Sequence, residues 1–295
     1  MVGNQTAASA REDGIALRLA MSCPDQAGIV AEVATALARA GAWITEAGQH
    51  TDAEAGWFFM RWVFRVAEAD EEGLRAEVKR FAPSLGAQQW RLERIDARPR
   101  VVLMVSHEAH CLTDLLARWR SGELAMEIPA IVSNHRSLAS IAECYAIPFH
   151  HVPVARETRS ADFVRLGETL EALRPDTIVL ARYMQILPAD LCARYPNRVI
   201  NIHHSFLPSF VGARPYHQAY ARGVKLIGAT CHYVTEDLDA GPIIEQDVTR
   251  IRHDDSVDDL VRKGRDVERS VLARGLRYHL EDRVLTHGNK TIVFD

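Results

Sequence analysis

The chain has 295 residues, a length that corresponds to about two domains of ordinary size. Its 47% hydrophobic and 25% charged residues are typical of a globular protein. The net charge of −4 argues against a protein that binds nucleic acid through a general basic surface, and no apolar run approaches the ~18 residues of a membrane span. Residues 1–13 form a polar lead-in without the apolar core of a signal peptide, and the five cysteines form no CxxC pair. We therefore expect a cytoplasmic protein that uses neither a membrane nor a nucleic acid.

Residues 14–96 predict a small β-α-β-β-α-β domain of the ferredoxin-like type. Apolar alternation indicates a first strand, and apolar residues at helical spacing follow it up to Gly41, a candidate helix C-cap. Asp70 is a candidate N-cap for the second helix. The expected strands cover 15–21, 43–50, 57–66 and a segment between 87 and 95, and the helices start near Ile29 and Asp70.

Residues 100–295, which follow the polar linker 96–100, predict an open and mostly parallel α/β sheet. The run 101–105 is continuously apolar, as in a buried parallel strand, and helical and strand patterns alternate after it. Beyond Lys225 the pattern changes to two longer strands around the turn 237–242. The last helix opens at Ser256 with Asp259 in a box-like cap. The other expected elements are helices 110–120, 162–173 and one from Ser137, and strands 128–132, 178–180 and 199–202.

Candidate chemistry lies at the end of the strand that begins at Val199. Asn201 and His203 are two residues apart, so both side chains point to the same face of an extended segment. An amide beside an imidazole can stabilise the oxyanion of a carbonyl under attack, but the two could equally be hydrogen-bonded loop anchors. Asp239, just before Ala-Gly-Pro, could be a turn carboxylate, or it could orient a catalytic water or balance a histidinium.

The sequence offers little support for a nucleotide-binding loop, a serine nucleophile or a metal site. The sequence contains no GxGxxG or GxxxxGK[ST], which argues against a dinucleotide or P-loop enzyme, and no GxSxG elbow that would make Ser205 a nucleophile. Neighbouring histidines occur without an HExxH motif or a carboxylate-bearing cluster, so we expect no metal site.

The motif Asn201-Ile-His203-His-Ser-x-Leu-Pro, combined with Glu-Asp-Leu-Asp239-Ala-Gly-Pro, resembles the folate-dependent formyltransferase family. The catalytic Asn, His and Asp of that family map onto Asn201, His203 and Asp239. The front domain, with Pro-Asp-Gln-Ala-Gly at residues 24–28, resembles an ACT domain. An ACT domain before a formyltransferase-type, Rossmann-like domain is the arrangement of the deformylase branch, and His204 stands where the ribonucleotide transferases usually have Pro.

The resemblance implies hydrolysis of 10-formyltetrahydrofolate to formate and tetrahydrofolate, which supplies formate and balances one-carbon folate pools for purine biosynthesis. Asn201 and an imidazolium at His203 would stabilise the oxyanion, and Asp239 would support the imidazolium and hold the water. No cofactor is expected, because the folate is the substrate. The resemblance places the pterin in the stretch 181–187, where Gln185 replaces a frequent Arg. The expected substrate-binding residues are Met184, Gln185, Ile186, Leu187, His204 and Leu238.

Two alternative functions belong beside the deformylase hypothesis. A formyltransferase would use the same three residues to pass the formyl group to an amine, but the loop at Ser106 carries Glu108 in place of a glycine-rich phosphate cradle. The other alternative is a non-catalytic protein that senses amino acids through its ACT domain. The resemblance also implies an amino-acid effector at that domain and a homo-oligomer, either a dimer or a tetramer.

Overall fold

The computed structural model of the chain describes residues 14–208 and 215–295. The predicted lead-in 1–13 lies outside the described residues. The chain divides into two compact units. One contains the residues up to Ala97 together with Glu281–His287 and Ile292–Asp295, and the other contains Arg98–Leu280 and Gly288–Thr291. The chain leaves the first unit after Ala97, within the predicted linker 96–100, and returns to it in two short segments near its C-terminus.

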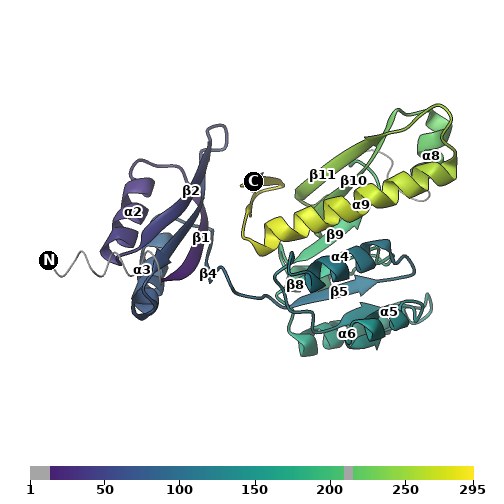
Figure 1. Cartoon of the computed structure of the whole chain (residues 1–295), viewed down its shortest axis with the longest axis horizontal. Helices are drawn as coiled ribbons and strands as arrows, with labels where there is room; N and C mark the ends of the chain where they lie inside the picture. The colour runs from purple at the N-terminus through teal and green to yellow at the C-terminus, as the bar shows by residue number, and fades with distance from the viewer. Residues whose placement is uncertain (1–13, 209–214) are drawn as a thin grey trace. The chain divides into compact units, whose positions relative to one another are not determined.

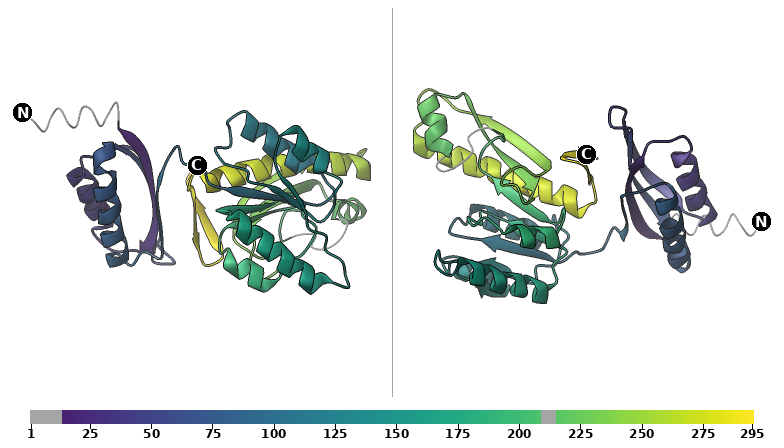
Figure 2. Two further views of the ribbon diagram at one scale, coloured as in Figure 1. Left: turned by 90° about the horizontal axis from the view of Figure 1, so that it is seen from below. Right: turned by 180° about the vertical axis from the view of Figure 1, so that it is seen from behind.

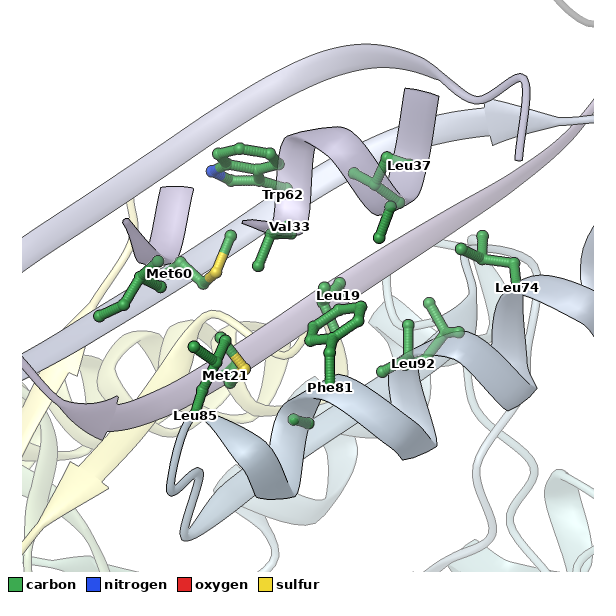
Figure 3. Close-up of a cluster of buried hydrophobic side chains, with 14 of the residues drawn as sticks. Leu19, Met21, Val33, Leu37, Met60, Trp62, Leu74, Phe81, Leu85 and Leu92 are labelled. Atoms are coloured by element: carbon green, nitrogen blue, oxygen red, sulfur yellow. The ribbon is translucent and has the colours of Figure 1, made fainter. Parts of the chain in front are cut away.

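The first unit has the predicted β-α-β-β-α-β order. Its antiparallel sheet has the strand order β2-β3-β1-β4, and α2 and α3 cover one face of it (Figures 1 and 3). Apolar side chains of both helices, such as Val33 and Phe81, pack against Leu19 and Met60 of the sheet. The elements are β1 (Ile15–Pro24), α2 (Ile29–Arg39), β2 (Trp43–Asp52), β3 (Trp57–Val66), α3 (Glu71–Ser84) and β4 (Gln89–Arg94).

One of the two helix caps expected in this unit is confirmed and the other is wrong. Gly41 takes a left-handed conformation (φ +67°) just after α2, and its N–H donates to the carbonyl of Ala38 at 3.0 Å. Asp70 precedes α3, but its side chain makes no capping hydrogen bond. A short 3-10 turn over Glu68–Asp70 leads into the helix and places Asp70 in a helical conformation, whereas a capping residue needs an extended one.

The other face of this sheet is covered by the C-terminal hairpin of β12 (Val284–His287) and β13 (Lys290–Val293). Leu285 and Phe294 form an apolar cluster with Trp57 and Phe59 of β3. This cover explains why β3 is buried on both faces, although an antiparallel strand usually has one polar face. The hairpin was not predicted from the sequence, because its two strands are only four residues long.

The second unit is the predicted open α/β sheet, with helices on both faces (Figure 2, left). Its seven strands lie in the order β11-β10-β9-β8-β5-β6-β7, parallel from β9 to β7 and antiparallel at β10 and β11. The strands are β5 (Val101–Val105), β6 (Ile131–Ser133), β7 (Phe149–His151), β8 (Thr177–Leu180), β9 (Val199–His203), β10 (Leu226–Tyr233) and β11 (Ile243–Arg250).

Figure 1 shows α9 running along β9, β10 and β11. It begins with the predicted capping box, in which the N–H of Ser256 donates to Asp259 at 3.0 Å and the N–H of Asp259 donates back to the Ser256 hydroxyl at 3.2 Å. No helix of the described residues is long and apolar enough to cross a membrane. The helices of this unit are α4 (His110–Arg120), α5 (Ala139–Cys144), α6 (Arg159–Leu173), α7 (Ala189–Arg194), α8 (Pro215–Arg222) and α9 (Val257–Leu280).

Differences from the predicted elements concern short segments. The strand expected at 128–132 begins at Ile131, because Pro129 has no N–H to contribute to the sheet. The elements β7, α7 and α8 were not predicted from the sequence, and each has eight residues or fewer. The parallel order matters most for function, because it brings the carboxyl ends of β5, β8 and β9 to one edge of the sheet.

Candidate active site

Two adjacent strands and the loop that follows one of them bring three polar side chains together. β9 ends with Asn201 and His203, and β10 runs antiparallel beside it and leads into the loop that carries Asp239. The His203 Nδ1 atom lies 3.3 Å from the Asp239 Oδ2 atom, and all three residues line one cavity. The three residues proposed from the sequence are therefore neighbours in space.

A tight loop holds Asp239 in this position. Asp239 has a left-handed backbone (φ +55°), which an aspartate tolerates better than most residues. The N–H of Tyr233 donates to the carbonyl of Pro242 at 2.9 Å and closes the loop. Between them, Gly241 lies so close to Tyr233 that a Cβ atom would stand 1.9 Å from the Tyr233 carbonyl oxygen. Only glycine fits there.

The contact between His203 and Asp239 sets the electrostatics of the site. The hydrogen bond from His203 and its positive charge hold the pKa of Asp239 below its usual value, against the opposing effect of burial. Asp239 is therefore a carboxylate at neutral pH. The other ring nitrogen of His203, Nε2, is buried and has no hydrogen-bond partner among the described residues. His203 can thus keep Nδ1 on the carboxylate and offer Nε2 to a ligand in the cavity.

His232, to which the sequence analysis gave no role, orients the amide of Asn201. The Nδ1 atom of His232 lies 2.9 Å from the Tyr233 carbonyl, which can only accept, so Nδ1 carries the proton. Burial lowers the pKa of His232, and its Nε2 is then an acceptor 3.2 Å from Asn201 Nδ2. One amide hydrogen of Asn201 is used in this bond and the other is available to a ligand. His232 lies directly opposite Asn201 in the β9–β10 register, a relation that appears only once the strands are paired.

The cavity has a volume of about 330 Å³, within the range of small-molecule sites. Three large apolar side chains at its lining are more than half exposed, namely Met184 (56%), Ile186 (56%) and Leu238 (57%). Exposed apolar side chains gathered around a cavity indicate a site for an apolar or aromatic ligand. The residues expected to bind substrate all line this cavity: Met184, Gln185, Ile186, Leu187, His204 and Leu238.

The segment 182–187, which follows β8, is fixed to the sheet by Ser106, which follows β5. The Ser106 hydroxyl accepts a hydrogen bond from the N–H of Met184 at 2.9 Å and donates to Asn134 Oδ1 at 2.6 Å. At the start of the segment, Arg182 has a left-handed backbone (φ +66°) and lies 3.5 Å from the buried carboxylate of Glu268. These anchors hold the wall of the cavity in place before a ligand binds.

His204 lies beside the catalytic candidate and carries no charge at neutral pH. Its ring faces the rings of His203 and Tyr216 edge-on, at centroid distances of 5.2 and 6.2 Å. Burial and, next, the positive charge of Arg182 lower the pKa of His204 to about 4. A neutral imidazole can accept a hydrogen bond from water or substrate.

We predict that this low pKa makes the fold sensitive to acid. Below pH 6.5 the unfolded chain protonates His204, whereas the folded chain does so only near pH 4, so the unfolded state binds more protons in this range. The free energy of unfolding should therefore fall as the pH falls from about 6.5 to about 4. His204→Gln should reduce the difference between the urea midpoints measured at about pH 7 and about pH 5, whereas the same change at the exposed His253 should not. An unchanged difference in the His204 variant would contradict the assignment.

One group of potential metal ligands is present in the described part of the chain. One ligand atom from each of His110, Cys111 and Glu268 lies within 4.8 Å of the others. The carboxylate of Glu268 already accepts hydrogen bonds from His110 and Tyr216 and lies beside the guanidinium of Arg182. All five cysteines are free thiols, and only Cys144 is exposed.

Comparisons with known proteins agree with this architecture. The sequence matches the ACT domain family over residues 18–82 and the formyl transferase family over residues 99–276. Fold and site thus define a two-domain protein, in which an ACT domain precedes a formyl transferase domain.

Individual relatives show which branch of the formyl transferase family this chain resembles. A formyltetrahydrofolate deformylase of Synechocystis is 49% identical over 94% of this chain and 97% of its own. The crystal structure of a formyltetrahydrofolate deformylase from Pseudomonas syringae has a TM-score of 0.93 and 53% identity, covering 99% of both chains. A glycinamide ribonucleotide transformylase from Symbiobacterium toebii has a TM-score of 0.64 and 29% identity, covering 67% of this chain and 95% of its own. The chain belongs to the formyltetrahydrofolate deformylase family.

Proposed function

We propose that the protein hydrolyses 10-formyltetrahydrofolate to formate and tetrahydrofolate. The observation that carries the proposal is the His203–Asp239 pair. Within the described part of the chain, His203 Nε2 has no hydrogen-bond partner, and it lies at a cavity lined by exposed apolar side chains. The family membership supports the same reaction. In the cell, it would supply formate and balance one-carbon folate pools for purine biosynthesis.

The proposed mechanism uses only the protein's own acid–base groups and water. Water attacks the formyl carbon, and the oxyanion that forms accepts hydrogen bonds from His203 Nε2 and from the free amide hydrogen of Asn201. The Asp239 carboxylate stabilises the imidazolium form of His203 and accepts a hydrogen bond from the attacking water. The bond between the formyl carbon and the folate nitrogen then breaks, and the proton released by the water passes to that nitrogen. The mechanism requires no cofactor.

Substrate binding is assigned to the walls of the same cavity. The exposed side chains of Met184, Ile186 and Leu238 offer an apolar surface to the pterin ring, and the polar edge of that ring can bond to backbone groups of 182–187. Leu187, the last residue of this segment, is buried in the apolar core and anchors the segment there. Gln185 carries no charge, so it offers the glutamate tail of the folate a hydrogen bond and no ion pair.

The loop after β5 favours water over a phosphorylated acceptor. Glu108 lies in this loop and accepts a hydrogen bond from Arg265 at 2.6 Å. Arg265 offsets part of the carboxylate charge, but a phosphate would have to displace Glu108 from this ion pair in order to bind. The Ser106 hydroxyl is already occupied by Met184 and Asn134.

We therefore expect glycinamide ribonucleotide at millimolar concentration neither to capture the formyl group nor to slow the release of formate. Repulsion by a partly neutralised carboxylate should weaken phosphate binding by about 1 kcal/mol, or about fivefold. The measurement is the yield of formate and of formylated ribonucleotide from 10-formyltetrahydrofolate. Stoichiometric formylated ribonucleotide with suppressed formate would identify a transferase.

We further propose that the protein is a homo-oligomer in the cytoplasm and that its ACT unit binds an amino-acid effector. β2 is an edge strand of the first sheet with Trp43 and Ile44 exposed, and exposed edges favour pairing with a second copy. The five free thiols fit a reducing compartment. A monomer in analytical sedimentation would contradict the homo-oligomer. The absence of a thermal shift with every amino acid would contradict the effector, and secretion of the protein would contradict the cytoplasmic location.

A further inference from the structure

A buried carboxylate outside the proposed reaction lies close to the site. Glu268 on α9 is 1% exposed, and its Oε2 atom accepts a hydrogen bond from His110 at 2.8 Å. Its Oε1 atom accepts one from the Tyr216 hydroxyl at 2.6 Å, and Arg182 Nε lies 3.5 Å from Oε2. Burial alone would raise the pKa of Glu268, but the bond from His110 and the charge of Arg182 hold it below its usual value. The four residues, called here the Glu268 cluster, come from α4, α8, α9 and the segment after β8.

The packing of this cluster leaves no room at Gly264, one turn before Glu268. A Cβ atom at Gly264 would lie 2.1 Å from the Tyr216 hydroxyl oxygen. The absence of a side chain at this position of α9 lets the hydroxyl of Tyr216 reach the carboxylate. The cluster is therefore a filled and rigid part of the fold, because moving one member would leave a buried charge without its partner.

The Glu268 cluster lies between two cavities. Arg182 belongs to the lining of the cavity that contains His203 and Asp239. His110 belongs to the lining of a second cavity, of about 520 Å³, beside the arginine-rich face of α9. The His110–Glu268–Arg182 contacts join these two linings. On the side of the active site, the Tyr216 ring faces His204, which in turn faces His203.

We propose that the Glu268 cluster is the wall that makes the reaction hydrolytic, because it denies the formyl carbon to any nucleophile larger than water. The proposal rests on the proposed deformylase function and names the residues that determine its specificity. An amine acceptor has to reach the formyl carbon from a side that the folate does not cover. In this proposal the second cavity, whose lining carries both arginines and aspartates, is the side from which an amine would approach, and the cluster closes that side.

Opening the wall should convert part of the hydrolysis into formyl transfer. The nitrogen lone pair of an amine would attack the formyl carbon and form a new C–N bond, and the bond to the folate nitrogen would break. The proton lost by the amine would pass to the folate nitrogen. The products would be a formamide and tetrahydrofolate in place of formate and tetrahydrofolate.

The test uses the full chain, 10-formyltetrahydrofolate and glycinamide as the amine probe. Tyr216→Ala and His110→Ala open the wall from α8 and from α4, and Tyr216→Phe and His110→Gln keep its volume as matched controls. We expect the ratio of formylglycinamide to formate, measured by mass spectrometry, to rise about tenfold or more in the opening variants. The ratio should stay at the wild-type level in the two controls.

Two outcomes would contradict the proposal that the Glu268 cluster excludes amines. One is formylglycinamide production by the wild-type protein, and this measurement does not depend on the folding of any variant. The other is a folded opening variant, verified by circular dichroism, that releases formate but gives no more formylglycinamide than the wild type. Of the two substituted positions, His110 is partly exposed whereas Tyr216 is buried, so His110→Ala is the variant that puts the fold less at risk. Failure of the wild type to release formate would instead refute the proposed function itself.

Discussion

Asp239→Asn should lower kcat by about 10²- to 10⁴-fold while the protein stays folded and binds tetrahydrofolate normally. The substitution keeps the size of the side chain but removes the negative charge 3.3 Å from His203 Nδ1. Without that charge the imidazolium loses its stabilisation, and the attacking water loses its strongest acceptor. The measurement compares kcat for formate release with the dissociation constant for tetrahydrofolate.

The control for this variant is Asp254→Asn, which neutralises an exposed carboxylate outside the lining of the cavity. It should leave kcat within about twofold of the wild type, because exposed charges are screened by water. Loss of the Asp239 ion pair should also lower the free energy of unfolding by about 1–3 kcal/mol. A near-normal kcat in Asp239→Asn would remove this residue from the mechanism.

Gly241→Ala should abolish most of the activity through the backbone alone. The new Cβ atom would stand 1.9 Å from the Tyr233 carbonyl oxygen, a distance at which the backbone must move. That carbonyl accepts the Nδ1 proton of His232, and Asp239 is only two residues from the substitution. A shift of the loop thus disturbs both the orientation of Asn201 and the carboxylate beside His203. We expect kcat/KM to fall by about 10²-fold or more, together with a lower melting temperature.

The same substitution at Gly73, in α3, is the control for Gly241→Ala. A Cβ atom there meets nothing within 4 Å, and alanine is the better helix former, so stability should rise by about 0.5–1 kcal/mol. Activity should not change. Wild-type kcat/KM in Gly241→Ala would mean that the loop tolerates the displacement and does not hold Asp239 as described.

Much of this architecture could be predicted from local patterns. The continuous apolar run 101–105, the helix 110–120 and the capping box at Ser256 each carry their signal within a few residues, and each is found where it was expected. Asn201, His203 and Asp239 could be named because they lie in motifs at strand ends. Their proximity follows from the antiparallel pairing of β9 with β10, because β10 leads into the loop that carries Asp239.

The remaining features depend on contacts between distant segments and leave no local pattern. His232 acquires its role from strand register, because it lies opposite Asn201 on a neighbouring strand. The C-terminal hairpin has strands of four residues, and its place on the first sheet depends on burying Leu285 and Phe294 against Phe59. Asp70 has the right residue type for a cap, but a 3-10 turn changes its backbone conformation.

The most direct test of the central claim is the production of formate and tetrahydrofolate from 10-formyltetrahydrofolate when no acceptor amine is present. The proposed site predicts sustained turnover, with one formate and one tetrahydrofolate formed for each substrate consumed, because water is the only nucleophile required. Formate can be followed with a coupled dehydrogenase and tetrahydrofolate by its absorbance, with Asp239→Asn as the inactive reference. Turnover that appears only after an amine is added, with the formyl group recovered on that amine, would contradict the hydrolytic account.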